Sequence, residues 1–261
     1  MISLREHFRC VPEIIRFSND LCYTDAPLIP LRQPPPNPLP PLVTTFVPDG
    51  YCEGDGQRLI NRAEADKIVQ TIQECLENET YEGKTMGVIV LQGHAQAELI
   101  EKKLAEVLEP KVREERKLRC GVPATFQGDQ RDVVFLSLVV APNHRYRALT
   151  TLDDQRRFNV AMSRARDQVW LLHSVQQQDL SREDLRWRLL SFFNGSRQSP
   201  EIYEDLDRLE RDVKHTPRRP GEQPDPYESW FEVDFALELV RRKYKVRPQY
   251  CEQLGIRPSG L

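Results

Sequence analysis

The residues best suited to chemistry lie in RRFNVAMSRAR, residues 156–166, where arginines flank an apolar run. In a helix, Phe158 and Met162 fall on one apolar stripe that suits burial against a sheet. Arg157 and Arg164 are seven residues apart, so a helix would project them together along the border of that stripe. Arginines at such a border bind phosphate groups or form ordinary surface salt bridges. The pattern alone leaves both interpretations open.

A second stretch, ATFQGDQRDVVFLSLV at 124–139, combines a polar turn with a buried strand. Gly128 lets the backbone approach a partner closely, because glycine has no side chain. Thr125 and Gln127 supply hydrogen-bonding groups at the same turn. Near the start of the chain, LREHFRCVPEIIRFSN places Arg9 just before a helix that opens with a proline.

Strands and helices alternate between these stretches, which predicts an α/β fold with a parallel sheet. The apolar patterns predict strands at 42–47, 86–91, 131–140 and 168–174, and helices at 1–25, 61–76, 95–108 and 154–166. Asn61 and Glu64 have the spacing of a capping box at one helix start. Eight prolines within 27–41 exclude a helix there and predict an extended connection.

Composition limits which cellular compartment and which kinds of ligand site are expected. The formal net charge is −3, so any phosphate site must arise from local clustering of basic residues. The six cysteines show no C-x-x-C pair, which predicts no metal site and favours a reducing, cytoplasmic compartment. No apolar run approaches the roughly 20 residues of a membrane span, and the start lacks a signal core.

The tetrapeptide EGKT at 82–85 contains the Gly-Lys-Thr that ends a phosphate-binding P-loop. A full P-loop also has a glycine five residues before the second one, and here that position is Asn78. The segment moreover precedes a strand, whereas a P-loop follows one. We therefore expect no P-loop in this chain.

Three of these stretches resemble motifs IV, V and VI of superfamily 1 helicases of the nonsense-mediated-decay-helicase type. They are HFRCVPEIIRFSN, TFQGDQRDVV and RRFNVAMSRAR, in family order, and MGVIVLQGHAQAELIEKKL is similar to the family's segment between motifs IV and V. The resemblance covers about residues 2–176. It implies the second RecA-like motor domain, a P-loop-NTPase fold without a P-loop, with a parallel sheet flanked by helices.

The resemblance also implies roles for the arginines. In this family ATP binds between two RecA-like domains, and the first domain supplies the P-loop and the magnesium carboxylate. Arg164 then corresponds to the arginine finger, Arg9 to a second phosphate sensor, and Arg157 to a residue that holds the cleft geometry. ATP and Mg²⁺ are expected to bind only with a first RecA-like domain from the same or an adjacent product, so the chain alone is expected to be inactive.

Motif V carries the remaining implied contacts. Thr125 would hydrogen-bond a phosphodiester oxygen, while Gln127 and Gly128 would shape the turn, with Gly128 beside the nucleotide. The family has a nucleotide-contacting glutamate where this chain has Gln130. Glutamine keeps an acceptor oxygen but loses the charge, which weakens the expected coupling to the nucleotide.

After residue 176 the sequence predicts a helical extension at 177–214 and a linker at 215–229. The stretch ESWFEVDFALELVRRKYKVRPQY then resembles the start of a very-short-patch-repair-like PD-(D/E)xK nuclease domain, truncated within 230–261. Glu232 would match its first acidic position. The family's metal-binding Asp and Glu-x-Lys are missing, so no nuclease activity and no metal site are expected, and for this chain's own activity an ordinary amphipathic helix is the preferred interpretation of 231–243.

Two hypotheses for function come from different classes. The first is the C-terminal half of an ATP-dependent nucleic-acid helicase, with DNA favoured over RNA because the tail resembles a nuclease. The alternative is a non-catalytic nucleic-acid-binding module or a truncated gene remnant. A proline-rich adaptor that binds through 27–41 is a third and weaker hypothesis.

Overall fold

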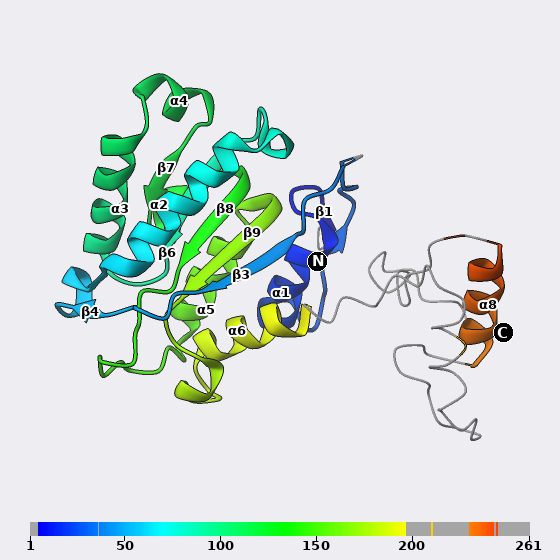
Figure 1. Ribbon diagram of the computed structural model, residues 1–261. Helices are drawn as coiled ribbons and strands as arrows, with labels where there is room; N and C mark the ends of the chain where they lie inside the picture. Colours follow the sequence, from blue (N-terminus) through cyan, green and yellow to red (C-terminus); the bar gives the residue numbers. More distant parts are fainter. Residues whose placement is uncertain (1–4, 36, 197–209, 211–229, 243, 245–261) are drawn as a thin grey trace. The chain divides into compact units, whose positions relative to one another are not determined.

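A computed structural model describes residues 5–35, 37–196, 210, 230–242 and 244 (Figure 1). The chain divides into two compact units, Met1–Ser196 and Arg197–Leu261. The part of the expected helical extension after residue 196 and the expected linker at 215–229 lie outside the described residues, except for residue 210. The site discussed below belongs entirely to the first unit.

A five-stranded parallel sheet forms the centre of the first unit, in the order β3-β9-β8-β6-β7. Its strands are β3 (Leu42–Phe46), β6 (Met86–Val90), β7 (Arg119–Gly121), β8 (Arg131–Ser137) and β9 (Ala165–His173). Two short ladders flank it: β1 (Glu6–His7) with β2 (Ile29–Pro30), and β4 (Cys52–Glu53) with β5 (Ile60–Asn61). The predicted α/β fold with a parallel sheet is confirmed.

Helices cover both faces of the sheet (Figure 1). One face packs against α1 (Pro12–Cys22), α5 (Leu152–Met162) and α6 (Leu185–Ser196), and the other against α2 (Arg62–Glu77) and α3 (His94–Val107). Short helices are α4 (Pro110–Glu115), η1 (Gly56–Arg58), η2 (Glu79–Tyr81), η3 (Pro123–Phe126) and η4 (Gln177–Asp179); α8 (Trp230–Arg241) belongs to the second unit. This three-layer arrangement is consistent with a RecA-like fold.

Successive residues of the central strands serve opposite faces, because strand side chains alternate. Val134 and Leu136 of β8 join the core beneath α1, α5 and α6, whereas Val133 and Phe135 join the core beneath α2 and α3. Burial on both faces explains why the strands appear in the sequence as continuous apolar runs.

Several expected boundaries are wrong, and three of them have clear physical reasons. The first helix starts at Pro12 rather than at residue 1, because Pro12 takes the first helical position and the preceding residues pair as β1. The helix expected at 154–166 ends at Met162, because Ala165 already pairs with Arg131 of β8. Strand β8 ends at Ser137 rather than at residue 140, before the left-handed backbone of Val139 (φ 72°).

The capping box predicted for α2 forms only in half. The Asn61 side chain accepts the Glu64 backbone N–H at 3.1 Å, as expected for an N-cap. The Glu64 carboxylate does not return to the Asn61 N–H, which instead donates to Gln96 Oε1 at 2.8 Å. Glu64 Oε1 accepts from the Ser137 hydroxyl at 2.6 Å and from the Val139 N–H at 2.8 Å. The carboxyl group therefore ties α2 to the end of β8.

Candidate functional site

Three segments distant in sequence meet where strands β8 and β9 begin. The Arg131 N–H donates to the Arg164 carbonyl at 3.0 Å, which joins the start of β8 to the turn before β9. The Val11 N–H donates to the Arg166 carbonyl at 2.9 Å, and Cys10 Sγ lies 3.5 Å from the Ser163 carbonyl oxygen. The three stretches singled out in the sequence thus meet at the end of the sheet where β8 and β9 begin. We call this surface, which includes Arg9, Arg131 and Arg164, the Arg164 edge.

Arg164 lies in the turn between α5 and β9 and is 7% exposed. Its guanidinium donates to the Val160 carbonyl at 3.2 Å, to the Phe126 carbonyl at 3.3 Å and to the Ser163 hydroxyl at 3.2 Å. All three acceptors are neutral, and within the described residues no carboxylate forms an ion pair with Arg164. A charged group held this way is oriented but not neutralised, which favours an anionic ligand.

Arg9 supplies a second positive charge to the same edge. It is exposed in the bend between β1 and α1, and its side chain makes no hydrogen bond or ion pair within the described part of the chain. Burial first, and then the charge of Arg9, lowers the pKa of Arg164. The charge of Arg9 therefore lies close enough to Arg164 to concentrate positive potential at this edge, which favours an anionic ligand.

His7 belongs to this edge, although its position in the sequence carried no separate signal. Its Nε2 accepts the Cys10 backbone N–H at 3.2 Å, which braces the bend that carries Arg9. Burial is the main cause that lowers the pKa of His7, and the charges of Arg9 and Arg164 lower it further. His7 is therefore held in its neutral form, as a structural acceptor rather than a third cation.

The motif V-like turn lies beside Arg164 through the Phe126 carbonyl. Thr125 is exposed on η3, and its hydroxyl donates to the Val122 carbonyl at 2.8 Å. Gln127 is exposed. Gly128 has φ +82°, and a Cβ there would meet no described atom within 4 Å, so its backbone conformation explains the glycine.

Gln130 lies on the same turn, next to Arg131, a charged residue that was not identified from the sequence. Arg131 is largely buried, donates to the Lys117 carbonyl at 2.7 Å and pairs with Asp129 at 2.5 Å. The hydrogen bond from Arg131 is the main cause that lowers the pKa of Asp129. Arg131 Nη1 also donates to the Gln130 carbonyl at 2.8 Å. The signal in the sequence was the alternation of charges in GDQRD, at the start of the strand.

Arg157 does not lie beside Arg164. Its Nη2 donates to the Leu91 carbonyl at 2.6 Å, just past the carboxyl end of β6, and its Nη1 lies 3.7 Å from Asp154. Arg164, by contrast, lies where β8 and β9 begin. The expectation that the two arginines project together from one helix is wrong, because α5 ends before Arg164.

Other candidate residues lie elsewhere. Lys84 of the EGKT turn forms an ion pair with Asp167 at 3.2 Å and precedes β6. Glu232 is half-buried on α8 in the second unit, and residues 245–261 of the nuclease-like stretch lie outside the described residues.

In the part of the chain that the structure describes, no three His, Cys, Asp or Glu side chains converge as metal ligands. None of the described helices has the length and apolar character needed to cross a membrane.

Comparison with known proteins assigns this unit to a family. A family model described as an AAA domain matches residues 1–176 of the 261 in the chain. This range contains all three segments of the edge described above. No curated protein matches the chain.

Proposed function

Because the chain belongs to this AAA domain family, which is found in C-terminal regions of superfamily 1 helicases, we propose that it is the second half of a helicase motor. In this proposal the motor is of the nonsense-mediated-decay type. It converts ATP hydrolysis into movement along a nucleic acid only together with a first RecA-like domain, carried by the same or an adjacent product.

The observation that carries the proposal is the arrangement of Arg164. Its guanidinium is buried, is oriented by three neutral acceptors, and lies within electrostatic reach of Arg9. A residue that only formed a surface salt bridge would have a carboxylate partner and more exposure. A guanidinium that is fixed in place and forms no ion pair with a described carboxylate can stabilise the negative charge that develops on a transferred phosphoryl group.

The residues present fit the terminal phosphate of ATP but not the rest of the nucleotide site. Arg164 and Arg9 would neutralise the γ-phosphate, and Gln130 with Gly128 would lie beside the nucleotide. The described residues offer no carboxylate cluster for Mg²⁺ and no P-loop. Those groups, which polarise the phosphates, belong in this proposal to the first domain.

The nucleic acid in this proposal runs along the exposed side of the motif V-like turn. Gln127 is exposed there, and its amide can donate to a phosphodiester oxygen; Thr125 is also exposed, and its hydroxyl can donate to one when it turns away from the Val122 carbonyl. We propose DNA rather than RNA as the track, on the nuclease-like character of the tail around Glu232. No cleavage of the track is proposed.

The test combines the chain with the first RecA-like domain encoded beside it and measures ATP hydrolysis stimulated by single-stranded DNA. Arg164→Ala is expected to lower kcat by about 10³–10⁵-fold, the range for an arginine finger. Arg156→Ala is the matched control, since Arg156 is 75% exposed on α5 and pairs only with Asp153 in the described residues. It is expected to leave kcat unchanged.

Equal activity of the Arg164→Ala and Arg156→Ala proteins would refute the role of Arg164. Binding to single strands that depends on salt but not on any nucleotide, with no hydrolysis in the mixture, would instead support the non-catalytic binding module.

A further inference from the structure

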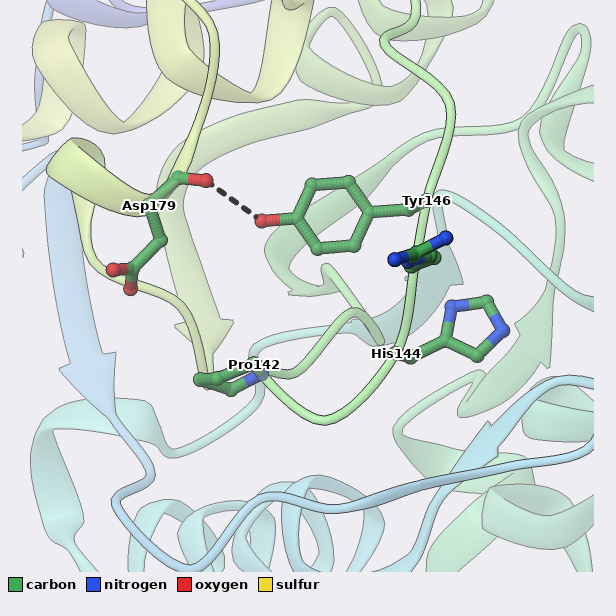
Figure 2. A pocket seen from close by; sticks show the side chains of 5 residues that line it. Pro142, His144, Tyr146 and Asp179 are labelled. Carbon is green, nitrogen blue, oxygen red and sulfur yellow. Dashed lines mark hydrogen bonds between the residues drawn. The ribbon is translucent and has the colours of Figure 1, made fainter.

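A second surface whose residues could bind nucleic acid is formed by residues 142–150, which follow the carboxyl end of β8, whereas the Arg164 edge lies where β8 and β9 begin. Several contacts hold this segment in place. Asn143 exchanges two 2.9 Å hydrogen bonds with the backbone of Cys52. His144 Nε2 lies 2.7 Å from Asp55, and the Tyr146 hydroxyl donates to the Asp179 carbonyl at 3.0 Å (Figure 2). A connection without regular structure is thus fixed along its length.

The anchored residues alternate with exposed arginines. His144 and Tyr146 are half-buried, whereas Arg145 and Arg147 are exposed. In an extended segment alternate side chains point the same way, about 6–7 Å apart. The side chains of Arg145 and Arg147 make no hydrogen bond or ion pair to any described residue, so both charges are available to an external ligand.

Tyr146 is rigidly held. The Arg186 guanidinium lies 4.6 Å from the centre of its ring. Arg186 is itself buried, pairs with Asp184 at 2.6 Å and donates to the Arg147 carbonyl at 2.7 Å. An aromatic ring fixed in this way loses little freedom when a planar ligand stacks on it.

A pocket of about 480 Å³ opens beside the ring, lined by Pro142, His144, Arg145, Tyr146 and Asp179 (Figure 2). Tyr146 lines this pocket, whereas Arg186 does not. The Asp179 carboxylate accepts the Gln176 N–H at 2.7 Å, which satisfies part of its negative charge within the loop. His144 Nδ1 is buried without a partner among the described residues.

We propose that residues 142–147 form a second contact for single-stranded nucleic acid. A base stacks in the pocket against Tyr146 and His144, and Arg145 and Arg147 bind the phosphates on either side of it. Aromatic platforms bordered by unpaired arginines bind single strands in this way, with little dependence on sequence. The ligand class rests on the proposed function, but the residues are separate from those at the Arg164 edge.

The test measures fluorescence anisotropy of labelled oligothymidylate and oligouridylate, about 16 nucleotides long, with the full chain at several salt concentrations. The double variant Arg145→Ala/Arg147→Ala is expected to weaken binding and to lower the slope of log K against log salt by about 1.4, since each single-strand phosphate contact contributes about 0.7. Lys102→Ala/Lys111→Ala is the matched control. It removes the same charge from residues that are 77% and 81% exposed on α3 and α4, and it is expected to keep the wild-type slope.

The stacking step has its own variants. Tyr146→Leu is expected to weaken binding by at least about fivefold, because it removes the ring. Tyr146→Phe keeps the ring and loses only the hydroxyl, so it is expected to bind as the wild type does. Thermal unfolding of each variant identifies any loss of binding that comes from misfolding.

An unchanged affinity and salt slope in the arginine double variant would overturn this inference. If substitutions at Thr125 and Gln127 then weaken binding, the proposed helicase function survives that result. Failure of the wild-type chain to bind either oligonucleotide would overturn this inference, whereas the helicase proposal would still be decided by the ATPase assay in the presence of the first RecA-like domain. If unlabelled polyglutamate displaces the labelled oligonucleotide as effectively as unlabelled oligothymidylate does, the surface does not select nucleic acid. That result would indicate an acidic protein partner and would also overturn the inference.

Discussion

Glu64 has no exposed surface, although it lies in the first turn of a helix on the outside of the sheet. One carboxyl oxygen accepts from Ser137 and Val139, and the other, Oε2, has no hydrogen-bond partner among the described residues. Burial raises the pKa of Glu64 from 4.5 to about 7, and the hydrogen bonds from Ser137 and Val139 offset only part of that effect. A large fraction of the molecules therefore carries a proton on Glu64 near neutral pH.

This shift predicts how stability depends on pH. Because the folded pKa of about 7 lies above the unfolded value of 4.5, the contribution of Glu64 is fully present below about pH 4.5 and is lost as pH rises through 7. The loss amounts to at most about 3 kcal/mol. Urea unfolding at pH 5 and pH 8 measures it in the wild type and in Glu64→Gln, which cannot titrate and is expected to remove most of the difference.

Glu98→Gln is the control for this experiment, because Glu98 is exposed on α3. It is expected to retain the pH dependence of the wild type. An identical pH dependence in Glu64→Gln and the wild type would show that Glu64 does not hold a proton in the folded state.

At the residue scale the sequence predicted some of the site. Arg9 and Arg164 were identified from motifs, and the structure brings both to one edge. His7 and Arg131 were not identified, because the bend and the turn that orient them follow from hydrogen bonds between segments distant in sequence. Arg157 was grouped with Arg164 only by assuming that the helix continues past Met162.

The element that matters most for the site is α5, which carries the chain to Arg164. Thr151 caps it: the Thr151 side chain accepts the Asp154 N–H at 3.2 Å, and Asp154 Oδ2 accepts the Thr151 N–H at 3.2 Å. This reciprocal pair fixes where the helix begins. Strand pairing of Ala165 with Arg131 determines where β9 begins.

Thr151→Ala is expected to destabilise the first unit by about 1 kcal/mol, because it leaves an N-terminal amide of α5 without its acceptor. The corresponding fall in Tm is about 2–4 °C. Differential scanning calorimetry measures both. Thr150→Ala changes the exposed neighbour outside the cap and is expected to leave Tm unchanged; equal effects of the two substitutions would contradict the capping role.

At the element scale, periodicity predicted the buried strands well, because continuous apolar runs are typical of a parallel sheet covered on both faces. It did not predict β7, whose residues Arg119–Gly121 carry no strand pattern and pair only through β6. Helix ends were wrong for the same reason. Pairing with a distant strand overrides local helical preference, and that pairing is not visible in a single segment.

For the molecule as a whole, the first unit extends to Ser196, beyond the family match that ends at 176. Helix α6 adds Leu185, Leu189, Leu190 and Phe193 to the core shared with α1 and α5. Burial of four such side chains contributes about 6–12 kcal/mol, at about 1.5–3 kcal/mol each. That is comparable to the net stability of a whole domain.

A fragment of residues 1–196 is therefore expected to unfold cooperatively with a Tm close to that of the first unit in the full chain. A fragment of residues 1–176 is expected to be unfolded or severely destabilised, because it exposes the surface that α6 covers. Circular dichroism during heating compares them. A cooperative transition of equal Tm in the shorter fragment would show that α6 is dispensable.

The position of β3 at one edge of the sheet has a consequence for biosynthesis. In the part of the chain that the structure describes, residues 42–46 pair only with β9, at 165–173, so on the ribosome β3 lacks this neighbour until more than a hundred further residues have been made. Contacts of such long sequence separation form slowly and late. Throughout that interval the strand exposes unpaired backbone to other nascent chains, so the yield of active protein will depend on translation rate and on chaperones that shield the N-terminal segment.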